Sequence, residues 1–130
     1  MATISKICLS ESTDGRGIVV DVASNATVGS QAAGQLIHTG PSVAADYHEV
    51  WLWATNFNTS TETLCIQWGD TAANQEGDWF YTTINPNETV LVVPGWIIKG
   101  NASTALTVNA HSTTANKVNL VGYVNFIDAA

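Results

Sequence analysis

Basic residues are the scarcest class in this chain of 130 residues, with four Lys and Arg against eleven Asp and Glu and a formal net charge of −7. Because Lys6, Arg16, Lys99 and Lys117 are scattered, no basic patch is available to neutralise phosphates. We therefore expect neither nucleic acid nor an anionic membrane as a partner. Charged residues amount to only 12%, about half the usual share, and Thr, Ser, Asn and Gln take their place. Such a neutral polar surface leaves little repulsion between copies, which favours assembly.

Long apolar runs are also missing. No stretch approaches the roughly 18 apolar residues of a membrane-spanning helix, and the N-terminus has no continuous apolar segment typical of a secretory signal. We expect the protein to be made and kept in a cytoplasm, where thiols stay reduced. Cys8 and Cys65 could pair in an oxidising compartment, but two cysteines so far apart are more often separate buried thiols. The length suits one domain with a core of its own.

Motifs of catalysis are absent as well. The sequence has no G-x-S-x-G turn, no glycine-rich phosphate loop and no histidine pair at metal-binding spacing. His38, His48 and His111 lie far apart in sequence, and Cys65 lies within an expected strand rather than at a sharp turn. We expect no enzymatic activity and no cofactor.

The best candidate for metal binding is the polar segment 70–78 (DTAANQEGD). Its oxygen ligands for Ca²⁺ would come from Asp70, Asn74, Glu76 and Asp78. The spacing is not that of an EF-hand loop, and acidic side chains in a long surface loop are usually just hydrated. We therefore expect no bound metal.

The chain does contain a succession of short apolar segments separated by turn residues. Their alternation, with no helical period, predicts eight or nine strands. The expected strands are 3–9, 17–22, 35–39, 49–57, 62–68, 79–84, 88–94, 104–110 and 118–127. Turn signals such as Gly40-Pro41 separate them. The predicted fold class is all-β: a single-domain antiparallel β-sandwich or a jelly roll.

The segment from Glu49 to Asp70 is expected to organise the rest. Two strongly apolar runs flank a polar connector, which predicts a β-hairpin at the centre of the sandwich. The first run is apolar on both faces, with Val50, Leu52 and Ala54 on one and Trp51, Trp53 and Thr55 on the other. We expect one face in the core and the other against a loop, the N-terminal segment or a second copy. The second run, 62–68, alternates as a half-buried strand does.

Residues 1–35 differ in composition from residues 36–130, which we expect to form the sandwich domain. They are rich in Gly, Ser, Ala and Asn and hold few large apolar side chains. The segment is expected to be an edge strand, a mobile terminus or an extended arm that pairs with a partner's sheet edge. In the arm interpretation the residues that bind the partner are Thr3, Ile4, Ile7, Ile18, Val19 and Val20.

Tryptophan is frequent, with five residues in the chain. Rows of exposed Trp and Tyr on β-sandwiches bind sugars by stacking, and the candidates for this role are Trp53, Trp79, Tyr81 and Trp96. The alternative is a role in the core and between subunits, where aromatic residues also concentrate. We favour this alternative because apolar neighbours surround these positions. The predicted subunit interface contains Trp51, Trp53 and Tyr123.

Several segments, taken in order over residues 36–127, resemble small virion proteins of tailed bacteriophages. They are IHTGPS, EVWLWATN, TLCIQWGD, ETVLVVPGWII and VNLVGYVNFI. The shared features are a Gly-Pro turn, a strand ending in A-x-N, a strand ending in I-x-W-G, a VLVVPG strand and a closing GYVNxI strand. The segment 70–78 and Trp96 have no counterpart in that pattern.

The resemblance implies a structural role without catalytic residues, as a capsid decoration (cement) protein or a related head component. Proteins of this group are often small β-folds that trimerise on the capsid. The implied partners are the major capsid protein and further copies of the chain, and the implied location is the virion surface. The alternative function is a head or tail fibre domain, or a lectin-like glycan-binding module.

Overall fold

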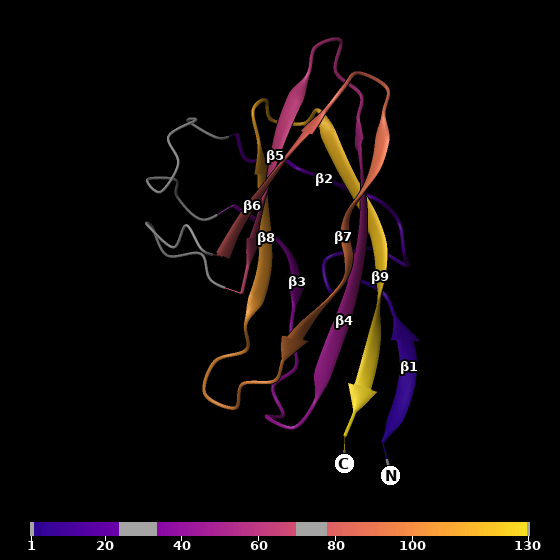
Figure 1. Ribbon diagram of the computed structural model, residues 1–130, viewed down its shortest axis with the longest axis vertical. Coiled ribbons are helices and arrows are strands. Elements are labelled where there is room, and N and C mark those ends of the chain that lie inside the picture. The colour runs from indigo at the N-terminus through magenta and orange to yellow at the C-terminus, as the bar shows by residue number, and fades with distance from the viewer. Residues whose placement is uncertain (1, 24–33, 70–77, 130) are drawn as a thin grey trace.

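The computed structural model describes residues 2–23, 34–69 and 78–129. It is a β-sandwich of two antiparallel sheets, which confirms the predicted fold class (Figure 1). The strands are β1 (Thr3–Ile7), β2 (Ile18–Val19), β3 (Gln35–Thr39), β4 (Tyr47–Asn56), β5 (Glu62–Trp68), β6 (Trp79–Ile84), β7 (Thr89–Lys99), β8 (Thr107–Ser112) and β9 (Val118–Asp128). Among the described residues, no helix has the length and apolar character needed to cross a membrane.

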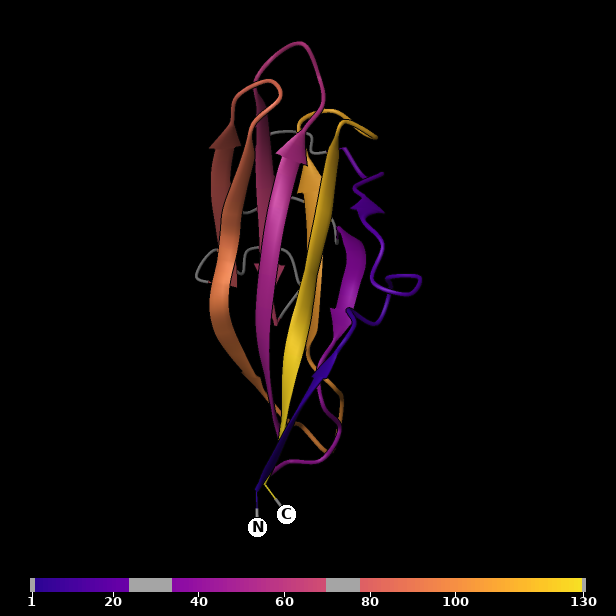
Figure 2. The ribbon, with the colours of Figure 1, turned by 90° about the vertical axis from the view of Figure 1, so that its right-hand side faces the viewer.

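The two sheets differ in size. The five-stranded sheet has the order β1-β9-β4-β7, with β2 pairing further along β9 on the same side as β1. The four-stranded sheet has the order β3-β8-β5-β6. Figure 2 faces the larger sheet and shows β7, β4 and β9 side by side, with β4 at its centre.

The predicted hairpin of the two apolar runs is wrong, because β4 and β5 belong to different sheets. β4 pairs with β7 and β9, whereas β5 pairs with β6 and β8. The connector 57–61 crosses between the sheets, and Asn56 holds this crossing. Its Nδ2 group donates to the carbonyl oxygens of Ser60 and Ile84, each at 2.9 Å, and its Oδ1 accepts from Asn58 N–H at 2.8 Å. Each strand has an apolar face, and the two faces meet across the core.

The core lies between the sheets. The predicted alternation of β4 is confirmed, since Val50, Leu52 and Ala54 are fully buried and the Trp51 and Trp53 side chains are only half-buried. Other buried core residues from the central strands are Leu64, Ile66, Val93, Val108, Ala110, Leu120 and Val124.

Strand β7 continues past the expected end of its strand at residue 94. Two register shifts against β4 interrupt the pairing, between Val50 and Trp51 and between Leu52 and Trp53. Gly95 lies at the first of these bulges with φ of 77°, a conformation that glycine adopts without strain. The bulge lets the chain pass Pro94 and Gly95 and remain paired up to Lys99.

Strand β5 is buried on both faces, although a half-buried strand was expected. Cys65 and Gln67, which point away from the core residues Leu64 and Ile66, are themselves fully buried. The chain at Gly34 lies over this face, because its N–H donates to Gln67 Oε1 at 2.7 Å.

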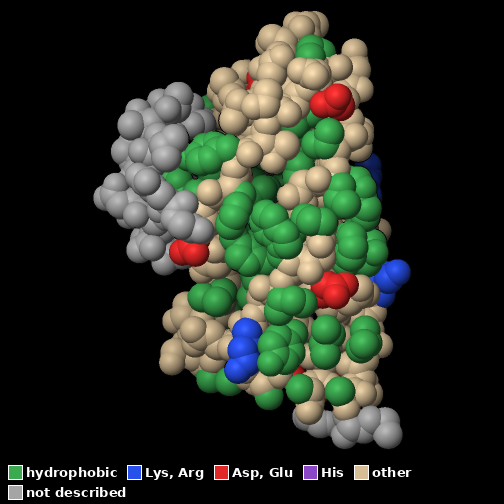
Figure 3. All heavy atoms as spheres, viewed as in Figure 1, with side chains coloured by type: hydrophobic (Ala, Val, Ile, Leu, Met, Phe, Trp, Pro, Cys, Tyr) green, Lys and Arg blue, Asp and Glu red, His purple; other side chains and the backbone are tan. Residues whose placement is uncertain are grey.

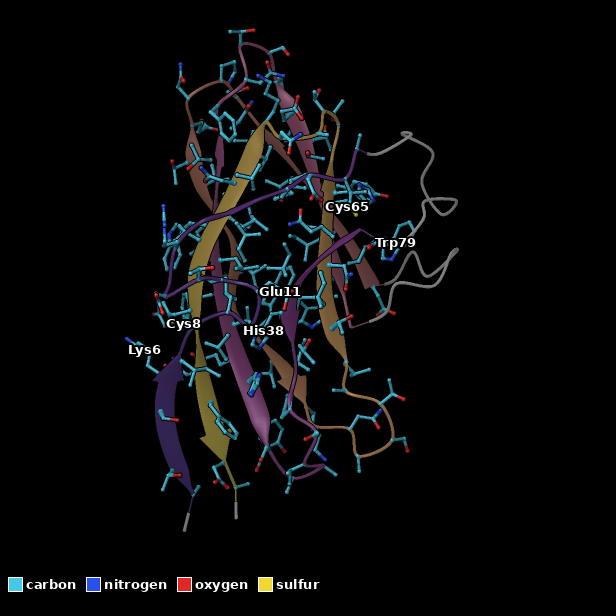
Figure 4. All side chains as sticks on the ribbon, turned by 180° about the vertical axis from the view of Figure 1, so that it is seen from behind. Lys6, Cys8, Glu11, His38, Cys65 and Trp79 are labelled. Carbon is cyan, nitrogen blue, oxygen red and sulfur yellow. The ribbon has the colours of Figure 1, made fainter. Side chains whose placement is uncertain are left out.

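The N-terminal segment runs along one edge of the sandwich. Strands β1 and β2 pair with β9, and Leu9 and Val20 are buried in the core. Ser112 N–H donates to Val22 O at 3.1 Å, so the same segment also reaches the smaller sheet (Figure 4). Of the three alternatives for residues 1–35, the pairing of residues 3–7 and 18–19 supports the edge strand. Residues 24–33 lie outside the described residues.

Candidate functional site

The outer face of the five-stranded sheet carries a group of three half-buried aromatic side chains. The β4–β9 register places Trp51 directly opposite Tyr123, and Glu49 opposite Asn125. Trp53 follows Trp51 on the same face at the two-residue spacing of a strand. The structure thus brings together the three residues of the predicted subunit interface. Whether a second copy covers them stays a prediction.

These three rings lie side by side rather than in a column. Trp51 is 6.4 Å from Trp53 and 6.4 Å from Tyr123, and Trp53 is 6.2 Å from Tyr123, measured between ring centroids. A stacked column would place its outer two rings about twice as far apart as neighbours, so equal distances define a triangle. The ring planes are also nearly parallel, at 17° to 32° from one another.

The orientation of this triangle follows from Gly95. A Cβ atom on Gly95 would lie 2.8 Å from Trp51 Cζ2 and 3.0 Å from Trp51 Cε2. The Trp51 indole therefore lies flat over the β7 backbone, with its other face directed outward. The planes of Trp53 and Tyr123 are inclined to the Trp51 plane by 22° and 17°. We call Trp51, Trp53 and Tyr123 the aromatic platform.

Polar groups border the aromatic platform. Glu49 Oε1 accepts hydrogen bonds from Trp51 Nε1–H at 2.7 Å and from Asn125 Nδ2–H at 2.9 Å. Both hydrogen bonds lower the pKa of the Glu49 carboxyl, and the bond from Trp51 has the larger effect. On the other side, Lys6 Nζ lies 4.4 Å from the Tyr123 ring centroid. The platform therefore combines apolar ring faces with one ionised carboxylate and one cation.

A second aromatic cluster lies in the seam between the edge strands β6 and β7. Trp96 packs between Phe80, at 4.7 Å, and Trp68, at 5.3 Å, measured between ring centroids. Figure 3 shows apolar side chains gathered between these two strands. Trp96 and Trp68 pack against the core while Phe80 is 42% exposed, so this cluster closes the open edge of the sandwich.

The predicted glycan-stacking residues do not form one exposed row. Trp79 is buried and packs edge-on against His111, with ring centroids 6.3 Å apart. Tyr81 is exposed on the same strand, and Trp96 lies in the seam on β7. Trp53, the fourth candidate, lies on the aromatic platform.

Cys65 and His111 are opposite each other in the β5–β8 register. Burial raises the pKa of the Cys65 thiol to about 11 and lowers the pKa of His111. A protonated thiol beside a neutral imidazole is not an activated nucleophile. The His111 ring nitrogens and Trp79 Nε1 are buried without a hydrogen-bond partner in the described chain.

The two cysteines are free; Cys65 lies in β5 of the smaller sheet and Cys8 just after β1 of the larger one (Figure 4). Cys65 is buried, as expected for a separate thiol, but Cys8 is exposed. The described residues contain no group of three or more His, Cys, Asp and Glu side chains that could hold a metal. Of the candidate calcium ligands only Asp78 is described. Asp70, Asn74 and Glu76 lie outside the described residues.

His38 and His48 meet inside the sandwich. Ser10 N–H donates to His38 Nδ1 at 3.0 Å, so the His38 proton is on Nε2, and this group donates to His48 Nδ1 at 2.8 Å. Burial lowers the pKa of both rings, and Asp46 opposes the shift at His48. The pair ties the N-terminal segment to β3 and β4. A signal for it was present, since His48 continues the inward row of Val50.

The predicted arm residues divide into two groups. Thr3, Ile4 and Val19 are exposed, and Ile4 is the most exposed large apolar side chain described, at 71%. Ile18 and Val20 are buried in the core of the chain itself, and Ile7 packs partly against that core. Only the first group is accessible to a partner in this structure.

No protein-family model and no curated protein matches this chain.

Proposed function

We propose that this chain is a capsid decoration protein of a tailed phage, which binds the outer surface of the capsid and stabilises the shell. The order of strand motifs over residues 36–127 supports this proposal, and so does the β-sandwich fold. The observation that carries it is the unprotected edge of β1, which offers a way to attach to another protein.

Strand β1 is paired on one side only. It forms a regular five-residue register with β9, and none of the described strands pairs with the backbone groups on its other side. The edge strands β3 and β7 are interrupted by register shifts, a feature that discourages pairing with other chains. β6 is also regular, but it begins next to residues outside the described part of the chain. We infer that a strand of the major capsid protein pairs with the free edge of β1.

The exposed side chains of β1 and its neighbourhood suit this role. Thr3 and Ile4 are exposed on the strand, and Val19 is exposed on β2 along the same edge. Each contact of this size is weak alone, so stabilisation of a shell comes from many copies acting together. Trimerisation on the shell is part of the proposal and would multiply the contacts further.

The test is co-sedimentation with capsids of the phage that encodes the chain, prepared without this protein. The full chain should bind saturably, and a variant that lacks residues 1–8 should not. The truncation keeps Leu9 and Val20, the buried anchors of the N-terminal segment, and circular dichroism will show whether the sandwich remains folded. Because a truncation can disturb folding, Ile4→Lys provides a second variant at a fully surface position.

Phe57→Ser is the matched control, since Phe57 is 43% exposed and follows the end of β4 that is remote from β1. It should bind as the unmodified chain does. Unchanged binding of both β1 variants would remove β1 from the contact. Failure of the full chain to bind any capsid would contradict the proposed function itself.

A further inference from the structure

The outer face of the five-stranded sheet points to a second binding activity. We propose that the aromatic platform, together with Glu49 and Asn125, binds a neutral oligosaccharide of β-linked pyranoses with equatorial hydroxyl groups. Of the residues of β1, Lys6 alone borders this site, and the inference does not depend on the proposed function.

Flat, outward-facing rings are suited to sugar rings of this kind. A pyranose whose hydroxyl groups are all equatorial presents only C–H bonds on its two faces, and these carry partial positive charge. The face of an aromatic ring is its negative region, so the two surfaces attract each other. Trp51 is held in place before binding, by its contact with Gly95 and its hydrogen bond to Glu49, which reduces the entropy lost when a ligand binds.

Glu49 supplies the directional contact. Its Oε1 atom is occupied by Trp51 and Asn125, but Oε2 accepts no hydrogen bond from the described residues. Because its pKa is lowered, the carboxylate stays ionised at neutral pH and is a strong acceptor for sugar hydroxyl groups. The same charge repels acidic sugars. This is why the ligand is assigned as neutral.

A second copy of the chain is the competing occupant of this face. Leu91, Ile97 and Val121 extend the apolar surface around the platform and are each at least 40% exposed. However, the cores of protein interfaces are depleted of charge, and covering an ionised Glu49 without a cation partner costs free energy. Lys6 is over Tyr123 at the border of the platform. A hydroxyl-rich ligand satisfies the carboxylate, whereas an apolar protein surface does not.

The experiment is a titration followed by tryptophan fluorescence, with cellohexaose and chitohexaose as the neutral probes. Contacts of a few rings, at the strength of aromatic pairs, predict dissociation constants on the order of millimolar for at least one probe. Trp53→Ala should weaken binding about tenfold. Phe80→Ala is the matched control, because Phe80 is an exposed aromatic residue in the seam and not on the platform, and it should leave binding unchanged.

The charge of Glu49 allows a second test, and a purely structural role of Glu49 would not produce its expected result. Glu49→Gln should weaken binding of the neutral probe that binds and, in the opposite direction, improve binding of a hexamer of β-1,4-linked glucuronate, an acidic sugar with the same equatorial geometry. The proposal is overturned if neither neutral probe binds saturably, or if Phe80→Ala and Trp53→Ala weaken binding equally. It is also overturned if light scattering shows an oligomer that Trp53→Ala dissociates while the sugar titrations show no effect. Trp53→Ala should still bind capsids, so a failure here leaves the decoration proposal standing.

Discussion

The buried histidine pair makes the stability of the fold depend on pH. The pKa of His38 is lowered from 6.5 to about 4, and burial lowers the pKa of His48 as well. Between these values the unfolded chain binds protons that the folded chain does not. The contribution of these pKa shifts to the free energy of unfolding is therefore complete above about pH 6.5. It is lost as the pH falls toward 4, by about 3 kcal/mol for His38 alone. Urea denaturation from about pH 7 to about pH 4.5 measures this loss.

A matched variant isolates the pair from other acid effects. In His38→Gln, the side-chain amide can accept from Ser10 N–H and donate to His48, but it does not titrate. This variant should lose less stability than the unmodified chain over the same pH range. Parallel losses in the two proteins would show that the histidine pair does not control acid sensitivity.

Position 122 requires glycine because β9 and β4 approach each other closely there. A Cβ atom at this position would overlap the carbonyl oxygen of Trp51, whereas a Cβ atom on Gly17 would lie 3.6 Å from its nearest neighbour, Leu120 O. Gly122→Ala should therefore lower the free energy of unfolding by about 2–3 kcal/mol or more, since the main chain must shift. Gly17→Ala is the control and should change it by less than about 0.5 kcal/mol. Equal urea midpoints for the two variants would contradict the tight β4–β9 contact.

At the scale of elements, strand β5 is protected on both faces. Cys65 is buried and its pKa is about 11, while Cys8, just after β1, is exposed. A thiol reagent at neutral pH should therefore modify one cysteine quickly and the second only when the protein unfolds. Cys8→Ser should abolish the fast phase. Two fast thiols in the native protein would mean that β5 is uncovered.

The sequence alone predicts which residues of β4 face the core, but it does not predict which strands pair with β4. The alternation within one strand depends only on consecutive residues, so the buried row and the exposed row could both be predicted. The hairpin of β4 and β5 was wrong because two apolar strands joined by a short polar connector can pair in one sheet or face each other across the core. The hydrogen bonds of Asn56 select the second arrangement.

The continuation of β7 was missed for a related reason. Pro94 and Gly95 have the composition of a strand end, and only the pairing with β4 reveals a bulge through which the strand continues. The glycine also creates the flat site for the Trp51 ring. Pro94 and Gly95 have the sequence of a turn, but the glycine is needed here because it leaves room for the Trp51 ring.

At the scale of the whole molecule, the candidate site depends on contacts between distant parts of the chain. The sequence places Trp51 and Trp53 on one face, because they are two residues apart in a strand. It does not show that Tyr123, Asn125 and Lys6 join them, since this depends on the pairing of β9 with both β4 and β1. Composition alone left the edge strand as one of three alternatives for residues 1–35, and the pairing of β1 and β2 with β9 supports it.

Two different parts of the five-stranded sheet carry the two proposals. The β1 edge is formed of exposed backbone and a few apolar side chains, and the outer face of the same sheet carries the aromatic platform. An edge recognises a strand, whereas a flat ring surface recognises a flat apolar face. The two proposals therefore concern separate surfaces and separate partners.

The decoration proposal requires this chain to be a component of a phage particle. Quantitative mass spectrometry of density-purified particles of the phage that encodes it is the most direct test, with the copy number measured against the major capsid protein. We expect the chain to be present at a fixed ratio to the major capsid protein. Its absence from purified particles, while it is abundant in the infected-cell lysate, would contradict the account.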